Sequence, residues 1–184
     1  VDLKILNVDV LSNKLVTDNP ANRCYYCKQG VFGTILEAAK NDGMTVILDG
    51  TNASDDADDR PGMKALQEMK VLSPLRMCGY VKSEIRKQSK EAGLFVYNKP
   101  SYACLATRIP TGTEIDEEKI KQVETAETFL FDLGFSDFRV RWMDNKAKIQ
   151  MPESQLQALM EKREVVLEEL SKIFDEVLLD LRTR

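Results

Sequence analysis

The first half of the chain alternates short apolar runs with longer stretches in which apolar residues recur at helical spacing. The apolar runs predict strands at residues 3–8, 45–48 and 71–73, and the helical stretches predict helices at residues 22–41, 61–69 and 81–92. A run that is apolar throughout is typical of a parallel strand covered on both faces. The order of these elements therefore predicts an α/β fold with a partial doubly wound parallel sheet.

The pattern changes after Arg108, and it divides the chain into residues 1–108 and residues 109–184. In the second part the spacing predicts helices at residues 116–133 and 153–174, and strands at residues 138–142, 146–151 and 176–181. Apolar residues in the first of these strands alternate with Arg139 and Arg141, so both arginines are expected on a solvated face. Asp144 and Asn145 are expected to form a two-residue hairpin turn. This order predicts a small α+β domain.

The chain has 184 residues and a formal net charge of −4, with four cysteines and no histidine. The absence of histidine excludes general acid–base catalysis by imidazole. The apolar runs are much shorter than a membrane span, and neither a signal peptide nor the basic composition of a nucleic-acid-binding protein is evident. We therefore expect a cytoplasmic protein whose cysteines are reduced thiols used for metal binding or catalysis.

The cysteine spacing carries the most specific chemistry in the sequence. Cys24 and Cys27 form a CxxC motif at the start of a predicted helix, and Cys104 lies in a distant loop. Three thiolates that share one metal ion or cluster would leave one metal position open for chemistry. The residues alone leave two alternatives open, a redox pair and two semi-buried helix positions without chemistry. Cys78 is expected to be a small buried residue outside the site.

Ordered motifs along nearly the whole chain resemble those of the LarE-like ATP-dependent sacrificial sulfur transferases, which belong to the PP-loop ATP pyrophosphatase superfamily. The motifs are RCYYCK (23–28), LDGTN (48–52), DDRPG (58–62), PL (74–75), KSEIR (82–86), CLATRIP (104–110) and RVR (139–141). The resemblance implies that ATP adenylates a carboxylate of a pyridinium dicarboxylate mononucleotide. A sulfur donor then converts the acyl-adenylate into a thiocarboxylate, which is used in the nickel-pincer cofactor of lactate racemase.

The same resemblance implies the cofactors ATP and Mg2+, together with a [4Fe-4S] cluster. Family members of one type sacrifice a single cysteine sulfur near the equivalent of the Cys104 loop. Members with three cysteines like Cys24, Cys27 and Cys104 hold the cluster, and this chain has all three. They are the expected catalytic and metal-binding residues. A fourth protein thiolate would occupy the iron to which exogenous sulfide binds in this type.

One motif of the superfamily is absent from the sequence, the phosphate loop Ser-Gly-Gly-x-Asp-Ser. We interpret the chain as N-terminally truncated, with residues 1–108 as the C-terminal portion of the ATP pyrophosphatase domain. The chain by itself is expected to bind ATP weakly and to be inactive, because the backbone-amide nest for pyrophosphate is missing.

The remaining expected site residues are basic side chains and one loop. Asp49, Gly50 and Thr51 follow a predicted strand, at the edge where α/β sheets bind nucleotides. Arg23 and Lys28 flank the CxxC motif and are expected to favour thiolates. Guanidinium groups bind carboxylates and phosphates in bidentate fashion, and Arg60 and Arg108, in loops near this edge, are expected to bind substrate. The resemblance implies that Arg139 and Arg141 contact a substrate phosphate and that Lys82 faces pyrophosphate.

Two other functions stay open. A different PP-loop enzyme, such as a tRNA thiolation enzyme, also fits a CxxC motif with a distant third cysteine, but the acidic composition does not favour nucleic acid. A non-enzymatic zinc-binding domain would use all four cysteines. The expected partners are a small-molecule nucleotide substrate and sulfide or another sulfur donor, with no membrane. Assembly into a homo-oligomer stays open.

Overall fold

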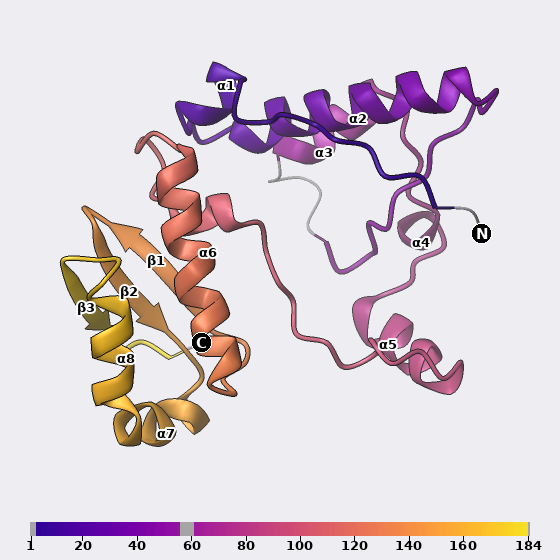
Figure 1. Cartoon of the computed structure of the whole chain (residues 1–184). Coiled ribbons are helices and arrows are strands. Elements are labelled where there is room, and N and C mark those ends of the chain that lie inside the picture. The colour runs from indigo at the N-terminus through magenta and orange to yellow at the C-terminus, as the bar shows by residue number, and fades with distance from the viewer. Residues whose placement is uncertain (1–2, 56–60, 184) are drawn as a thin grey trace. The chain divides into compact units, whose positions relative to one another are not determined.

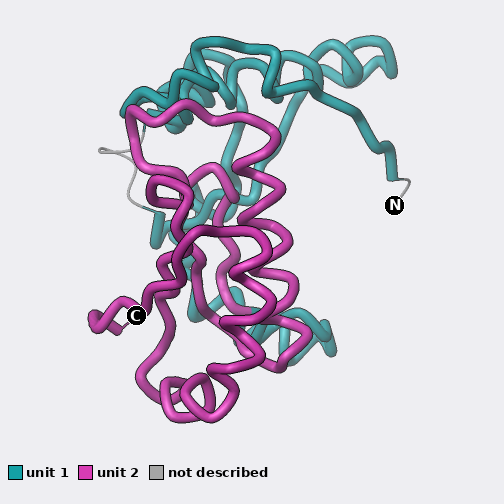
Figure 2. Tube along the Cα trace, turned by 60° about the vertical axis from the view of Figure 1, so that its left-hand side comes forward, with its two compact units in different colours: residues 1–99 teal, residues 100–184 magenta. Residues whose placement is uncertain are grey.

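The computed structural model describes residues 3–55 and 61–183 (Figure 1). The chain folds into two units, residues 1–99 and residues 100–184 (Figure 2). This division lies ahead of the boundary drawn after Arg108 from the sequence pattern. The segment that carries Cys104 therefore belongs to the second unit.

Helices form most of the regular structure described in the first unit. They are α1 (Lys14–Thr17), α2 (Arg23–Asn41), α3 (Pro61–Glu68), α4 (Pro74–Met77) and α5 (Lys82–Glu91). The three longer helices predicted for this part are thereby confirmed. Helix α2 stops just before Gly43, whose φ of 74° a glycine adopts without the steric cost that a side chain would bring.

The strand predicted at residues 3–8 is wrong. This segment has no regular secondary structure, and the side chains of Leu3 and Ile5 are 86% and 79% exposed. A strand is stable when a neighbouring strand accepts and donates its backbone hydrogen bonds. Among the described residues no other segment pairs with this one.

The other two predicted strands of the first unit meet at a single parallel bridge between Leu48 and Leu72. Leu72 N–H donates to Ile47 O at 3.0 Å, and Asp49 N–H donates to Leu72 O at 2.9 Å. In the described part of this unit, the parallel pairing expected from the sequence is reduced to this contact. A doubly wound sheet therefore stays a prediction.

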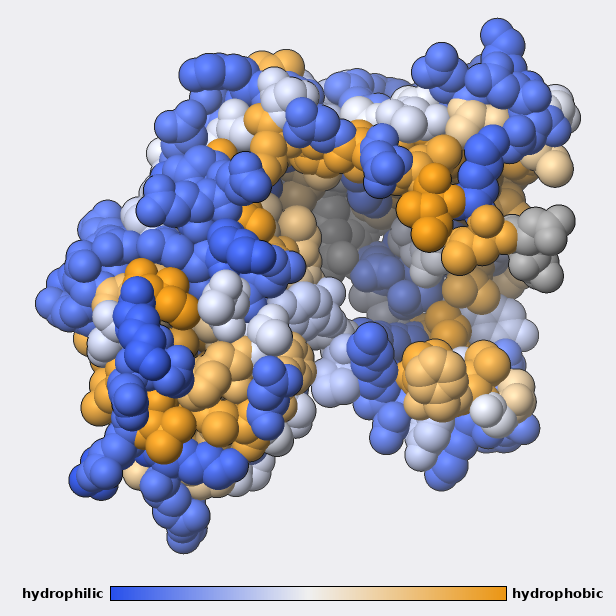
Figure 3. Space-filling model, in the orientation of Figure 1, coloured by the Kyte–Doolittle hydropathy of each residue, from blue (hydrophilic) through white to orange (hydrophobic). Residues whose placement is uncertain are grey.

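Helix α3 supplies most of the small buried core of the first unit. Met63 and Leu66 from α3 pack with Val71, and Phe32 and Ile47 lie against them. Apolar side chains also remain at the surface of the molecule (Figure 3), among them Val46, Leu48 and Leu72 beside the parallel bridge.

The second unit is an α-β-β-α-β fold, as the sequence predicted. Its elements are η1 (Leu105–Arg108), α6 (Glu117–Asp132), β1 (Arg139–Met143), β2 (Lys146–Gln150), η2 (Glu153–Gln155), α7 (Leu156–Glu161), α8 (Arg163–Leu170) and β3 (Glu176–Leu179). The side chain of Asp116 caps α6 by accepting a hydrogen bond from Lys119 N–H at 2.7 Å. The chain as a whole is thus a mixed α/β protein.

A three-stranded mixed sheet with the order β1-β2-β3 forms one layer of the second unit. Strand β1 is antiparallel to β2, with Val140 opposite Ile149, and β3 is parallel to β2. The predicted turn between β1 and β2 is confirmed, because Asp144 and Asn145 have φ angles of 46° and 58°, as a two-residue hairpin requires. Helices α6, α7 and α8 contribute to the core on one face of this sheet (Figure 1).

The core of the second unit is larger than that of the first, and its residues are more completely buried. Its buried members are Ala126, Leu130, Phe135, Phe138, Val140, Ala147, Ile149, Met151, Leu159, Val166, Leu170 and Phe174.

No helix among the described residues is long and apolar enough to cross a bilayer.

Candidate functional site

The CxxC motif lies on the first turn of α2. Cys24 and Cys27 are three positions apart and therefore lie on the same side of the helix. Cys24 is exposed, and Cys27 is partly buried. Tyr25, between them, donates a hydrogen bond from its hydroxyl to Glu68 Oε2 at 2.5 Å and so joins this turn to α3. The hydrogen bond to Glu68 raises the pKa of the Tyr25 phenol.

Cys104 stands immediately before the short helix η1 in the second unit. Its carbonyl oxygen accepts hydrogen bonds from Thr107 N–H at 2.9 Å and from the Thr107 hydroxyl at 2.7 Å. These bonds close the turn, while the Cys104 thiol is exposed. The backbone of the turn is therefore fixed, and the thiol is accessible to a reactant.

Arg108, the last residue of η1, is buried and paired with Glu127 of α6. Arg108 Nε lies 2.6 Å from Glu127 Oε1, and Arg108 Nη2 lies 3.0 Å from Oε2. A third guanidinium nitrogen, Nη1, donates to the Thr107 hydroxyl at 2.9 Å. Glu127 also accepts a hydrogen bond from Val140 N–H at 2.8 Å. This bond satisfies a backbone amide of the edge strand β1. The buried pair thus joins the Cys104 turn to both α6 and β1.

Glu127 carries no motif that would identify it as a functional residue from the sequence. Glu127 lies on the stripe of α6 that also buries Val123 and Leu130. A carboxylate on a buried stripe requires a charged or hydrogen-bonded partner, because an unpaired buried charge is costly. That signal is present in the sequence, although the sequence does not name the partner.

The ring of Tyr102 lies next to two guanidinium groups. The Cζ atoms of Arg108 and Arg139 are 5.3 Å and 5.8 Å from the ring centroid, within the range of cation–π contacts. Burial raises the pKa of Tyr102 to about 12, and a hydrogen bond with Glu127 adds to this, while the two arginines oppose it. Tyr102 therefore stays neutral at physiological pH.

Arg139 is buried, and the expectation of a solvated face is wrong for this residue. Its Nη2 donates to Ser101 O at 2.7 Å, and its Nη1 donates to Phe138 O at 2.6 Å. The Ser101 segment covers this part of the strand, so alternation alone places the residue on the correct face but misjudges its exposure. Arg139 holds the segment that leads to Cys104.

Arg141 is exposed, as expected, and it lies on the same face of β1. Its Nη1 donates to Thr107 O at 3.0 Å, and its Nε donates to Gln150 Oε1. Lys148 lies directly opposite on β2 and pairs with Asp180 at 2.8 Å. Hydrogen bonds from Lys148, and then from Gln150, hold the pKa of Asp180 well below its usual range. Two cations thus share one sheet face with the turn that carries Cys104.

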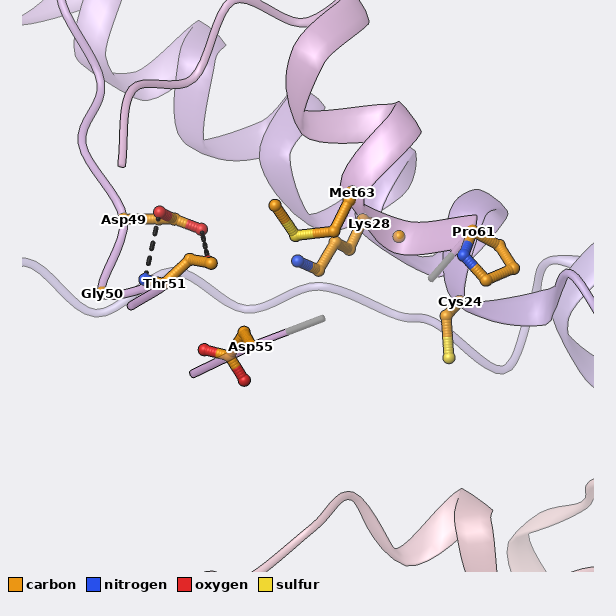
Figure 4. A pocket seen from close by; sticks show the side chains of 9 residues that line it. Cys24, Lys28, Asp49, Gly50, Thr51, Asp55, Pro61 and Met63 are labelled. Atoms are coloured by element: carbon orange, nitrogen blue, oxygen red, sulfur yellow. Dashed lines mark hydrogen bonds between the residues drawn. The ribbon is translucent and has the colours of Figure 1, made fainter. Parts of the chain in front are cut away.

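In the first unit, a pocket of about 520 Å³ opens beside the parallel bridge (Figure 4). It is lined by Cys24, Lys28, Asp49, Gly50, Thr51, Asp55, Pro61, Gly62 and Met63. The structure therefore brings together the three expected nucleotide-edge residues and one cysteine of the CxxC motif. A pocket of this size can hold a small-molecule ligand.

Asp49 is held by hydroxyl donors on two sides of the bridge. The Ser73 hydroxyl lies 2.6 Å from Oδ1, and the Thr51 hydroxyl lies 2.6 Å from Oδ2. Burial raises the pKa of Asp49, but these hydrogen bonds and the Lys28 charge outweigh burial and leave the pKa below its ordinary value. Asp49 is therefore an ionised residue that organises the loop.

The other expected residues lie apart from this pocket lining or outside the described structure. Arg60 lies outside the described residues. Lys82 is exposed at the first position of α5, and its backbone N–H donates to the Ser54 hydroxyl at 2.9 Å. Cys78 is exposed, so the expectation of a buried cysteine is wrong. The one-turn helix α4 that precedes it buries no residue.

The three cysteines of the expected cluster are divided between the units, with Cys24 and Cys27 in the first and Cys104 in the second. Within the described part of either unit, no three cysteine, aspartate or glutamate side chains gather into a metal-binding group. The three-cysteine site therefore stays a prediction.

No protein-family model matches the chain. An uncharacterised protein of Synechocystis is 37% identical over 171 residues, which are 93% of this chain and 63% of that protein. An uncharacterised protein of Methanocaldococcus jannaschii is 31% identical over 161 residues, 88% of this chain and 63% of that protein. The chain thus spans less than two thirds of the length of these relatives.

A third relative has an assigned activity in its name. It is the pyridinium-3,5-bisthiocarboxylic acid mononucleotide synthase of Lactiplantibacillus plantarum, 34% identical over 149 residues, which are 81% of this chain and 54% of that protein. The chain spans about half of that enzyme. The resemblance of the motifs is supported at this level: the chain is related to the LarE sulfur-insertion enzyme at moderate identity.

Proposed function

We propose that this chain is part of an ATP-dependent sulfur transferase that converts a carboxylate of a pyridinium dicarboxylate mononucleotide into a thiocarboxylate for nickel-pincer synthesis. The relationship to the Lactiplantibacillus plantarum synthase supports the reaction class. The structural observation that carries the proposal is the exposed Cys104 thiol on a turn held by the buried Arg108–Glu127 pair. Such a turn presents sulfur in a fixed position.

The reaction consists of two displacements. A carboxylate oxygen of the substrate attacks the α-phosphorus of ATP, and pyrophosphate leaves. A sulfur nucleophile then attacks the acyl carbon, and AMP leaves with the original oxygen, so the product carries sulfur in its place. The first unit would supply part of the nucleotide domain. The pocket beside Asp49 supports this, because it opens next to the Leu48–Leu72 parallel bridge and α/β sheets bind ligands at the carboxyl ends of their strands.

The second unit supplies the side chains that hold the substrate near the Cys104 turn. Arg141 and Lys148 lie opposite each other on one sheet face, and because Lys148 pairs with Asp180, Arg141 is the cation of this pair that can bind a substrate phosphate. Arg108 and Arg139 use their guanidinium groups on Glu127 and on backbone carbonyls of the same segment. They therefore act as positioning residues for the turn, and Arg141 is the arginine available for substrate.

The donor chemistry of the three cysteines fits an iron–sulfur cluster. They are not joined by disulfides, Cys24 and Cys104 are exposed, and thiolates are the ligands that such clusters use. A [4Fe-4S] cluster on Cys24, Cys27 and Cys104 would supply an iron without a protein ligand, at which exogenous sulfide binds. The arginine anchors of the second unit then serve to keep Cys104 in one orientation.

Metal analysis of anaerobically reconstituted protein tests the three-cysteine assignment. Wild-type protein and the Cys78→Ser variant should each bind about four irons and about four acid-labile sulfides per chain. Cys24→Ser, Cys27→Ser and Cys104→Ser should each lose most of this iron. One zinc per chain that requires all four cysteines would instead favour a non-enzymatic zinc domain.

The reaction itself is tested in the complete protein that contains this chain. We expect ATP, Mg2+, sulfide and the dicarboxylate mononucleotide to give a product in which one oxygen is replaced by sulfur, detected by mass spectrometry. Arg141→Ala should weaken substrate binding by about 1.5–3 kcal/mol, the range for a hydrogen bond to a charged group. If protein with an intact cluster gives no sulfur-containing product, the proposal is contradicted.

A further inference from the structure

Lys28 is the cation among the described residues that line the pocket beside Asp49. In Figure 4 its nitrogen points toward Asp49 and Thr51 and away from the thiol of Cys24. The Lys28 charge contributes to the low pKa of Asp49. Lys28 nevertheless makes no hydrogen bond or ion pair with any other described residue. An ammonium group in a pocket, with no such partner, is available to a ligand.

The stem of Lys28 is held in place by Gly62 at the start of α3. A methyl group at Gly62 would lie 3.1 Å from both Cδ and Cε of Lys28, closer than an ordinary contact. The absence of a side chain at Gly62 therefore lets the lysine stem lie flat against the first turn of α3. This contact directs the ammonium into the pocket, unlike a lysine that extends freely into solvent.

The first turn of α3 adds a second positive feature to the same wall. Pro61, Gly62 and Met63 line the pocket, and the first amides of a helix have no acceptor within the helix. A helix N-terminus favours anions, and phosphate groups bind there readily. Both carboxylates in the lining have donors, because Asp49 accepts from Ser73 and Thr51 and Asp55 accepts from Asn52. Lys28 and the start of α3 are the features of this lining that favour an external anion.

We propose that Lys28 binds the phosphate group of a nucleotide in this pocket. The assignment of a nucleotide rests on the proposed function, whereas the preference for an anion rests on Lys28 and the first turn of α3. The pocket volume of about 520 Å³ accommodates a mononucleotide. Lys28 is then a substrate-binding residue of the first unit.

Calorimetric titration of the 184-residue chain tests this proposal with AMP, nicotinate mononucleotide and inorganic phosphate as probes. Lys28→Gln should weaken binding of the preferred nucleotide by about tenfold to a hundredfold, the loss expected for one charge-assisted hydrogen bond. Lys40→Gln, an exposed position on the same helix, is the matched control and should bind as the wild type does. Preference for AMP assigns the pocket to the ATP-derived nucleotide, and preference for nicotinate mononucleotide assigns it to the pyridinium substrate.

Gly62→Ala provides a second variant that keeps the lysine charge. The added methyl group displaces the Lys28 stem, so binding should weaken severalfold while remaining tighter than in Lys28→Gln. Equal affinity in wild type and Lys28→Gln overturns the proposal, as does the absence of nucleotide binding at millimolar concentrations. Inorganic phosphate that binds as tightly as both nucleotides overturns the nucleotide assignment. The iron and sulfide content of the wild-type protein and sulfur transfer in the complete protein are measured separately, and they test the proposed function independently of these titrations.

Discussion

Arg108 and Glu127 form a fully buried ion pair, in which two guanidinium nitrogens contact the two carboxylate oxygens at 2.6 Å and 3.0 Å. The pair joins the end of the Cys104 turn to helix α6, and Glu127 also accepts from the edge of β1. The Glu127 carboxylate therefore helps to fix the segment that presents Cys104, a candidate ligand of the cluster.

Replacing Glu127 should destabilise the second unit strongly. Glu127→Leu leaves the Arg108 guanidinium buried without a counter-charge, which should cost about 3–5 kcal/mol of unfolding free energy. Denaturant unfolding followed by the fluorescence of Trp142, the single tryptophan in the chain, measures this loss. Glu124→Leu, at an exposed ion pair on the same helix, should cost less than about 1 kcal/mol.

The double variant Arg108→Met/Glu127→Leu separates charge from packing. Removing both partners should recover much of the stability lost in Glu127→Leu, because no buried charge remains unpaired. Equal stability of Glu127→Leu and Glu124→Leu would contradict the role of the pair.

Arg139 and Arg141 should respond differently to truncation, although they lie on the same strand face. Arg139→Ala removes one buried and one partly buried hydrogen bond to carbonyl oxygens and should cost about 2–4 kcal/mol of unfolding free energy. Arg141→Ala should change this free energy by less than about 1 kcal/mol, because Arg141 is exposed. Thermal unfolding of the two variants makes the comparison, and a larger loss in Arg141→Ala would reverse the assignment of roles.

The phenol of Tyr102 should titrate near pH 12. Its pKa is raised from 10.0 in the folded chain, so the folded state retains its proton where the unfolded chain loses it. The contribution of Tyr102 to stability is therefore complete below pH 10 and is lost as the pH rises through about 12. The difference in ultraviolet absorbance between wild type and Tyr102→Phe measures this titration. A midpoint at or below 10 would contradict the partial burial of the ring and its interaction with Glu127.

Asp49 should titrate below its ordinary value of 3.8. A lowered pKa stabilises the folded state above the unfolded value, and that contribution is lost as the pH falls through the folded value. The NMR shift of the Thr51 amide, which donates to Asp49 Oδ1 at 3.2 Å, reports this titration directly. Ser73→Ala removes one donor and should raise the midpoint toward 3.8. An unchanged midpoint would show that the Ser73 hydroxyl does not hold the carboxylate.

Local sequence patterns were sufficient to predict the order of helices and strands in the second unit, although the helical stretch predicted at residues 153–174 is divided into η2, α7 and α8. Asp116 caps α6, and Asp144 with Asn145 makes the hairpin turn, because these conformations depend on a few neighbouring residues. The strand predicted at residues 3–8 failed for the opposite reason. A strand depends on a partner that is distant in sequence, and local alternation does not reveal whether the partner is present.

The sequence by itself determined which residue types are available for chemistry: four thiols, no imidazole, a CxxC motif on a helix and arginines on one strand. Only the tertiary structure decided how each of them is used. It turned Arg108 and Arg139 inward toward Glu127 and backbone carbonyls, left Arg141 exposed, and directed Lys28 past Gly62 into the pocket beside Asp49. The physical reason is that exposure and hydrogen-bond partners depend on segments distant in sequence, whereas periodicity reports only the local backbone.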